Sequence, residues 1–212
     1  MHPGTGVGVI DEVEHLIEAE FKLKRGEFGL NASFHDGGVT ILTGENGTGK
    51  STFLNALAGF VPVDSGTIML NGRDITSMEI QRRNIVHITP NSYIGNLSVE
   101  KHIAFPGKPD ADTGLIGELK ESFGIDFRGK VGNLSMGQKI RVALATAFYR
   151  KPEALLIDEA LSNLSYAKEV FAEITRLSGS LKTDVIIVAH SLADMQGEHL
   201  YVMENGSMRR SY

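Results

Sequence analysis

Nine consecutive residues carry the strongest chemical signal in the sequence. They are Gly44, Glu45, Asn46, Gly47, Thr48, Gly49, Lys50, Ser51 and Thr52. Their spacing fits G-x-x-x-x-G-K-[ST], in which glycines let successive backbone N–H groups turn inward around an anion. The lysine of this pattern reaches the β- and γ-phosphates of a nucleoside triphosphate, and the next hydroxyl takes a place on Mg²⁺. We therefore expect residues 44–52, the phosphate loop, to bind a triphosphate.

Further groups suited to phosphate chemistry lie in the second half of the chain. Residues 134–138 (Leu-Ser-Met-Gly-Gln), called the signature segment below, directly precede a helical pattern. Asp158 and Glu159 end one apolar run, and His190 ends another. A carboxylate at the C-terminal end of a parallel strand is suited to supporting Mg²⁺, and its neighbour could activate a water. The alternative interpretations are a plain helix cap, surface carboxylates and a structural histidine.

The surrounding elements must bring these groups together. Short apolar runs without strict alternation predict parallel strands covered on both faces, over residues 39–43, 85–88, 154–158 and 185–189. Apolar residues at helical spacing predict helices over 51–58, 140–149 and 169–177. Strands are also expected over 16–23, 28–34 and 67–70, and Asn205-Gly206 predicts a hairpin between 200–203 and 207–210. The phosphate loop thus has the strand–loop–helix context that its function requires.

Residues 91–134 have a different texture, with short segments punctuated by glycine and proline. Ser98 is expected to cap a helix over 99–105, and a second helix is expected over 114–123. We interpret 91–134 as a helical subdomain inserted between residues 16–90 and 135–212, which form the nucleotide-binding core. Residues 1–15 are expected to be a mobile lead-in.

Composition narrows the classes of function. A chain of 212 residues with 42% hydrophobic residues suits one well-buried domain and argues against disorder. The net charge of −5 argues against a nucleic-acid partner, and the lack of cysteine excludes disulfides, thiolate catalysis and cysteine-ligated clusters. No apolar run approaches the roughly 20 residues that span a bilayer, and the N-terminus lacks signal-peptide features. We expect a cytoplasmic chain that reaches a membrane only through a partner.

The ordered set of motifs resembles one protein family. The phosphate loop, the Leu-Ser-x-Gly-Gln segment, the run ending in Asp158-Glu159 and the strand-terminal His190 resemble the ATPase domain of ABC (ATP-binding cassette) transporters over about residues 16–210. The finer resemblance is to the ATPase subunits of oxyanion and other small-solute importers. It implies a single α/β domain of the P-loop NTPase class, with a RecA-like parallel core sheet, an antiparallel β subdomain and a small α-helical subdomain.

The resemblance also implies partners and roles. Two such domains close head to tail around two ATP molecules and drive an integral membrane permease, the second domain being another copy or a paralogous subunit. Within that site Lys50 contacts phosphate, Glu159 is the general base and His190 stabilises the γ-phosphate. Ser51 and Asp158 support Mg²⁺. The opposite chain contributes Ser135, Gly137 and Gln138. The aromatic that stacks on adenine is expected at Phe28, or else at Phe21, although a strand phenylalanine can equally be a core residue.

Three places depart from the family pattern. After the strand 85–88 the family places a glutamine, whereas Pro90 stands there and Asn91 is the nearest amide. We expect Asn91 on the metal side of the site unless it serves a turn. Met136 replaces the first glycine of the signature, and Ser165 replaces an aspartate. The catalytic residues are retained, while the loops that communicate with partners are altered.

The remaining basic and imidazole side chains have simpler interpretations. The basic groups Lys22, Lys24 and Arg25, Arg82 and Arg83, and Arg209 and Arg210 are expected to be solvated charges. The other histidines show no metal-ligand spacing, so Mg²⁺ is the only metal expected: His2, His15, His35, His87, His102 and His199.

These observations favour an ATP-hydrolysing subunit that dimerises on ATP and drives a membrane transporter. A rival from another class is a soluble ABC-type ATPase that acts as an assembly or regulatory factor without a membrane subunit. A third is a nucleotide-binding module with little hydrolysis, since the communication loops are altered.

Overall fold

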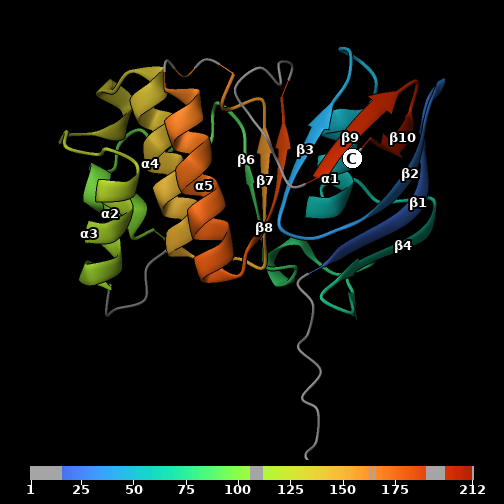
Figure 1. Ribbon diagram of the computed structural model, residues 1–212, viewed down its shortest axis with the longest axis horizontal. Coiled ribbons are helices and arrows are strands. Elements are labelled where there is room, and N and C mark those ends of the chain that lie inside the picture. The colour runs from blue at the N-terminus through green and yellow to red at the C-terminus, as the bar shows by residue number, and fades with distance from the viewer. Residues whose placement is uncertain (1–15, 106–111, 163, 165, 190–198, 212) are drawn as a thin grey trace, which may run out of the picture.

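The computed structural model describes residues 16–105, 112–162, 164, 166–189 and 199–211. Its strands form one curled sheet in the order β5-β4-β1-β2-β10-β9-β3-β8-β7-β6 (Figure 1). The strands are β1 (Ile17–Arg25), β2 (Phe28–Asp36), β3 (Val39–Thr43), β4 (Ser65–Leu70), β5 (Arg73–Asp74), β6 (Ile85–Ile88), β7 (Ala154–Asp158), β8 (Asp184–Val188), β9 (His199–Glu204) and β10 (Ser207–Arg210). The helices are α1 (Lys50–Ala58), α2 (Val99–Ile103), α3 (Thr113–Ser122), α4 (Met136–Tyr149) and α5 (Ala167–Leu181), with 3₁₀ turns at Ile80–Arg82 and Val131–Asn133.

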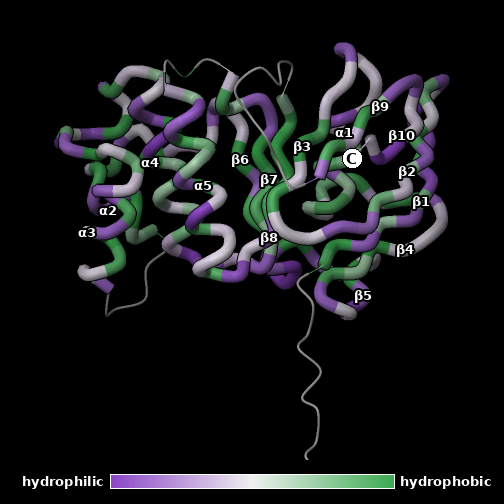
Figure 2. Tube along the Cα trace, in the orientation of Figure 1, coloured by the Kyte–Doolittle hydropathy of each residue, from purple (hydrophilic) through white to green (hydrophobic). Residues whose placement is uncertain are grey.

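One half of the sheet is parallel. Strands β9, β3, β8, β7 and β6 pair in parallel with one another in this order. Helix α1 lies on one face of these strands, and α4 and α5 lie on the other (Figure 1). Because both faces are covered, nearly every residue of β3, β7 and β8 is buried, and Figure 2 shows β7 and β8 among the most hydrophobic parts of the trace. The predicted parallel core is confirmed.

The other half is antiparallel. Strand β1 pairs antiparallel with β2 and with β4, and its exposure alternates. Ala19 and Phe21 are buried, whereas Glu20 and Lys22 between and after them are exposed. The hairpin β9–β10 joins the two halves, because β9 pairs with β3 and Ser207 of β10 pairs with Asn31 of β2. The predicted antiparallel part and the hairpin are both confirmed.

Helix α1 is enclosed by the two halves of the sheet. Phe53 and Leu57 are fully buried in a cluster that also contains residues of β1, β2, β7 and β8. The Phe53 ring stacks on Phe21, with centroids 6.0 Å apart, and also contacts Phe34 at 5.7 Å. Burial of one such side chain contributes about 1.5–3 kcal/mol. The helix that follows the phosphate loop is therefore held from both sides.

The short helices α2 and α3 pack on α4, where the rings of Phe123 and Phe148 stack with centroids 6.0 Å apart. Ser98 caps α2 by accepting a hydrogen bond from the N–H of Lys101, as predicted, although α2 ends before residue 105. The division into subdomains remains an interpretation of these elements. In the parts of the chain that the structure describes, no helix is both long enough and apolar enough to cross a membrane.

Arg83 corrects one expectation from the sequence. It is only 4% exposed, so the prediction of a solvated charge is wrong for this residue. Its Nη1 donates to the carbonyls of Ala56 (3.0 Å) and Leu57 (2.9 Å) at the C-terminal end of α1. Nη2 and Nε donate to the carbonyls of Thr76 (2.9 Å) and Met78 (3.0 Å). A cation is favoured at a helix C-terminus, where carbonyls lack partners within the helix.

Candidate nucleotide-binding site

The phosphate loop joins β3 to α1 with backbone angles that favour glycine. Gly44 and Gly49 have φ values of 147° and 113°. A Cβ at Gly49 would lie 2.7 Å from Phe28 Cζ, and one at Gly44 would overlap the carbonyl of Met203. Both the backbone conformation and the available space therefore exclude a side chain at these two positions.

The side chain of Lys50 turns back onto the start of the phosphate loop. Its side chain donates from Nζ to the carbonyls of Gly44 (2.8 Å) and Glu45 (2.7 Å), and the residue is 5% exposed. Thr48 Oγ1 donates to the carbonyl of Glu45 at 2.9 Å. The N-cap of α1 is Gly49, which has no side chain to accept from the first-turn N–H groups. A buried ammonium beside an uncapped helix N-terminus favours an anion in this loop.

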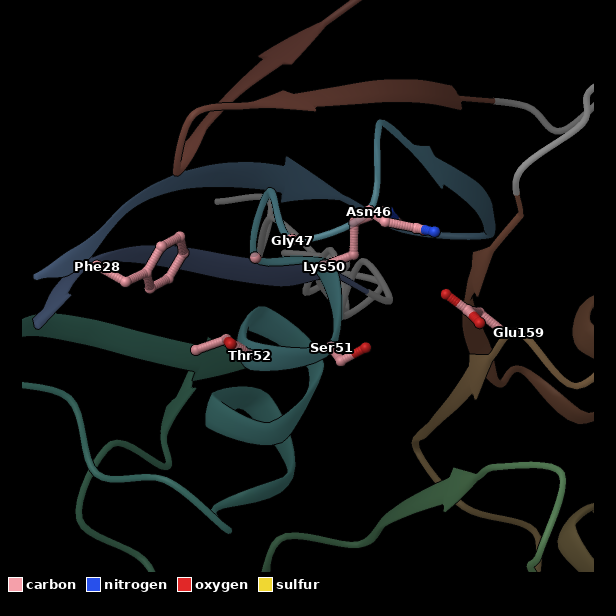
Figure 3. A pocket seen from close by; sticks show the side chains of 8 residues that line it. Phe28, Asn46, Gly47, Lys50, Ser51, Thr52 and Glu159 are labelled. Carbon is pink, nitrogen blue, oxygen red and sulfur yellow. The ribbon is translucent and has the colours of Figure 1, made fainter. Parts of the chain in front are cut away.

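The loop forms one wall of a cavity of about 200 Å³. Residues of the phosphate loop and of two distant strands line it: Phe28, Asn46, Gly47, Gly49, Lys50, Ser51, Thr52 and Glu159. Figure 3 shows the Glu159 carboxylate facing the loop from the end of β7, with Phe28 on the far side of the loop. Every one of these residues was predicted for the site from the sequence. The structure thus brings Glu159 and Phe28 to the loop from segments far apart in the chain.

The two phenylalanines considered for adenine contact lie in different surroundings. Phe21 is 2% exposed and stacks on Phe53 in the core, so it cannot reach a ligand. Phe28 is partly exposed at the start of β2, lines the cavity and places Cζ against Gly49. Of the two, only Phe28 is placed where an adenine ring could contact it, and that contact remains a prediction.

The two consecutive carboxylates have separate environments. Glu159 follows β7 with a φ of 56°, a conformation that costs a non-glycine residue about 1–2 kcal/mol and that turns it toward the cavity. Asp158 faces the α1 side of the sheet, as Ala154 and Leu156 do. Its side chain is 12% exposed, and Oδ1 has no hydrogen-bond partner among the described residues. A buried carboxylate oxygen without a partner fits a cation ligand, and with the Ser51 hydroxyl it gives the oxygen donors that Mg²⁺ prefers.

Comparison with known proteins decides the family. The model of the family described as "ABC transporter" matches residues 28–162, which include the phosphate loop, the signature segment and both carboxylates. The chain belongs to the ABC transporter family. The predicted resemblance to the ATPase domain of ABC transporters is thus confirmed.

Curated members of the ABC transporter family resemble the chain over most of its length. It is 34% identical to the molybdate/tungstate import ATP-binding protein WtpC of Thermococcus kodakarensis over 92% of the chain and 59% of that protein. It is 30% identical to the molybdenum import ATP-binding protein ModC of Rhizobium meliloti, with the same coverages of 92% and 59%. The chain therefore spans about three fifths of the length of these relatives.

A solved structure supports the same fold. The chain superposes on the ADP conformation of an ATP-binding cassette of an ABC transporter with a TM-score of 0.78 and 26% identity. The superposition covers 92% of the chain and 89% of that structure. The predicted α/β fold of the P-loop NTPase class is confirmed.

The signature segment of this ABC family member forms the start of α4. Ser135 is its N-cap: Ser135 Oγ accepts from the N–H of Gln138 (3.3 Å), and Gln138 Oε1 accepts from the N–H of Ser135 (3.0 Å). The helix cap is therefore present, and it starts α4 at Met136, earlier than predicted. The Ser135 hydroxyl still has its own proton to donate. Ser135, Gly137 and Gln138 do not line the cavity of their own chain.

The loop after β6 forms a turn where the ABC family usually has a glutamine. The N–H of Ser92 donates to the carbonyl of Thr89 (3.1 Å), and Ser92 Oγ accepts from the N–H of Thr89 (2.9 Å). Pro90 occupies the second turn position, which its fixed φ favours. Asn91 is exposed and is not among the cavity residues, so the turn interpretation is supported and the metal role stays a prediction. His190 and Ser165 lie outside the described residues.

One residue beside the site was not predicted. His87 Nε2 on β6 lies 4.0 Å from Asp158 Oδ2, and the His87 side chain is 8% exposed. Burial lowers the pKa of His87, and the charge of Asp158 acts in the opposite direction. The only signal in the sequence is an imidazole inside an otherwise apolar strand.

Proposed function

We propose that this chain is an ATP-binding and ATP-hydrolysing subunit of an ABC transporter. The proposal rests on a cavity that Lys50, Ser51 and Glu159 line together, with the unpartnered Asp158 Oδ1 on the adjoining residue. The names of the import ATP-binding relatives support ATP as the triphosphate.

The residues of the cavity suit attack of water on the γ-phosphate. Glu159 accepts a proton from the water as the water oxygen bonds to phosphorus, and the bond to the β–γ bridging oxygen breaks. Lys50 exchanges its two carbonyl acceptors for phosphate oxygens and neutralises charge there. Ser51 and Asp158 would hold Mg²⁺, which supplies further charge neutralisation. By the family resemblance, His190 donates to the γ-phosphate.

A second ATPase domain completes the site in this proposal. The cavity of about 200 Å³ is smaller than the roughly 300–1,000 Å³ of most complete small-molecule pockets. Ser135, Gly137 and Gln138 stand at the start of α4 with a serine hydroxyl proton and a helix N-terminus available to an anion. A second copy or a paralogous subunit brings these groups onto the γ-phosphate.

The transporter partner is an integral membrane permease, and the chain is a cytoplasmic protein held at the inner face of the membrane through it. The names of the molybdenum and molybdate/tungstate import relatives support a small oxyanion as the solute. The solute site itself belongs to the permease side of the complex.

One observation favours a second candidate, a soluble ABC-type ATPase without a membrane subunit. The turn at residues 89–92, built around Pro90, replaces the loop that the family uses toward its membrane partner. Purification of the native protein from membranes distinguishes the two: a co-purifying integral subunit supports the transporter, and a complex of non-membrane proteins supports the alternative.

Substitution of Lys50 tests the activity. Lys50→Ala should lower ATP turnover by about 10²- to 10³-fold, because a buried cation at the phosphates is lost. Lys24→Ala, at an exposed position on β1, is the matched control and should keep wild-type turnover. Equal turnover in all three proteins would contradict the proposed site.

A further inference from the structure

A histidine without an assigned role lies beside the carboxylate proposed to support Mg²⁺. His87 Nε2 lies 4.0 Å from Asp158 Oδ2, and the two side chains are 8% and 12% exposed. Within the described part of the chain, neither His87 Nε2 nor Asp158 Oδ1 has a hydrogen-bond partner. An unpartnered buried polar atom costs about 1–3 kcal/mol, so a hydrophobic residue at position 87 would be the more stable choice for this strand.

The strand register places His87 beneath Asp158. Strands β6 and β7 are parallel, His87 is paired with Leu156, and Asp158 lies two residues further along β7. Side chains two residues apart share a face, so His87 and Asp158 both project toward the α1 side of the sheet. Asp158 stands at the C-terminal edge, where the phosphate loop lies, and His87 approaches it from the interior. The Phe60 ring, 6.0 Å from the imidazole between centroids, is a further neighbour of His87.

We propose that His87 is a positioning residue, whose Nε2–H donates to Asp158 Oδ2 and thereby directs Asp158 Oδ1 toward the metal that accompanies ATP. This inference rests on the proposed function. The 4.0 Å separation exceeds a hydrogen bond by roughly 1 Å, a gap that a small rotation of either side chain closes when the nucleotide binds.

The proposed arrangement gives the two carboxylate oxygens different tasks. Oδ2 faces the imidazole, so a hydrogen bond there fixes the plane of the carboxylate. Oδ1, which lacks a partner, is left for the cation. Partners of this kind around a metal-binding carboxylate typically change metal affinity by about 10- to 100-fold.

The experiment compares His87→Leu, His87→Gln and wild-type protein. The probes are a non-hydrolysable ATP analogue, titrated in EDTA, and Mn²⁺, titrated in the presence of the analogue and followed by electron paramagnetic resonance. The free energy of unfolding is measured for each protein. His35→Leu, at a histidine whose side chain is 66% exposed, is the matched control.

His87→Leu should bind the analogue in EDTA as wild type does and should be at least as stable, because it removes an unpartnered buried nitrogen. Its half-saturating Mn²⁺ concentration should rise about 10- to 100-fold, and His87→Gln should recover most of this loss by donating from its amide. An unchanged Mn²⁺ dependence in His87→Leu would overturn the inference. It would also be overturned if His87→Leu and His87→Gln lost the same Mn²⁺ affinity and the same free energy of unfolding, because His87 would then have only a structural role. Failure of the wild-type protein to bind the analogue would instead contradict the proposed function.

Discussion

At the scale of single residues, Phe28 packs against Gly49 of the phosphate loop, next to the site where the phosphates are expected. Phe28 Cζ occupies the space that a Cβ at Gly49 would need, so the ring lies directly against the loop. Phe28 is also partly exposed and lines the cavity, unlike the other phenylalanines of the neighbouring core. An aromatic ring in this place offers a stacking surface to adenine while the loop holds the phosphates.

Phe28→Ala should weaken ATP binding, because stacking of a base on an aromatic ring is worth about 1–3 kcal/mol. The expected rise in the dissociation constant is about 5- to 150-fold, measured by isothermal titration calorimetry. Phe28→Tyr keeps the ring and should bind ATP with near wild-type affinity. If Phe28→Ala binds ATP as tightly as Phe28→Tyr does, the adenine contact lies elsewhere.

At the scale of elements, the guanidinium of Arg83 connects the C-terminal end of α1 to the chain between β5 and β6. It accepts nothing and donates four hydrogen bonds, two to the last turn of α1 and two to the stretch between β5 and β6. Since α1 begins at Lys50, the position of its C-terminal end helps to set the direction of the helix that presents the phosphate loop.

Arg83→Met should lower the free energy of unfolding by about 2–4 kcal/mol, because several buried carbonyls lose a charged donor at once. Arg82→Met is the matched control, since the side chain of Arg82 is 76% exposed and its loss should cost less than about 0.5 kcal/mol. Urea denaturation of both variants measures the difference. Equal stability of the two variants would mean that the Arg83 hydrogen bonds contribute nothing.

His102 connects the loop after β6 to helix α4. Its Nε2 accepts from the N–H of Ile94 (3.0 Å), so this nitrogen carries no proton. The proton of the neutral ring is then on Nδ1, which lies 2.8 Å from Thr146 Oγ1. Burial lowers the pKa of His102 below its ordinary value of 6.5, and that of His87 as well. The folded chain thus requires a neutral imidazole at position 102.

The stability of the protein should therefore fall as the pH decreases from about 6.5. Above that value both histidines are neutral in the folded and the unfolded chain, and their contribution is complete. Below pH 6.5 these histidines bind protons in the unfolded chain but not yet in the folded chain, which favours unfolding. The loss of stability ends when the pH falls below their lowered pKa values in the folded chain. His102→Gln keeps an acceptor for Ile94 without titrating, so unfolding curves between pH 5 and 8 should show a shallower decline. An unchanged decline would exclude His102 as its source.

The elements also show what the sequence could predict. The sequence was sufficient to predict the phosphate loop and the apolar strands β3, β6, β7 and β8, because each depends only on neighbouring residues in the chain. The solvated reading of Arg83 failed because its acceptors come from α1 and from residues 76 and 78, which only packing brings together. The proximity of His87 to Asp158 was not predicted, because it depends on the pairing of β6 with β7. Nothing in the sequence of either strand indicates which strand lies next to it.

At the scale of the whole molecule, the cavity and the signature segment do not meet within one chain. The cavity lies at the start of α1. Helix α4 covers the opposite face of the parallel strands (Figure 1). A head-to-tail pair of domains would bring α4 of each onto the loop of the other. Hydrolysis would end this paired state, so Glu159→Gln should accumulate as a dimer when ATP is bound. Sedimentation velocity measures this: the variant should be a dimer with ATP and a monomer with ADP.

The turnover of Glu159→Gln tests the central claim most directly. The substitution keeps the size of the side chain and removes the base, so ATP should still bind, within a few-fold of wild-type affinity, while steady-state turnover falls by about 10²- to 10⁴-fold. Undiminished turnover in a variant that binds ATP normally would contradict the account, because Glu159 would then not be the group that activates water.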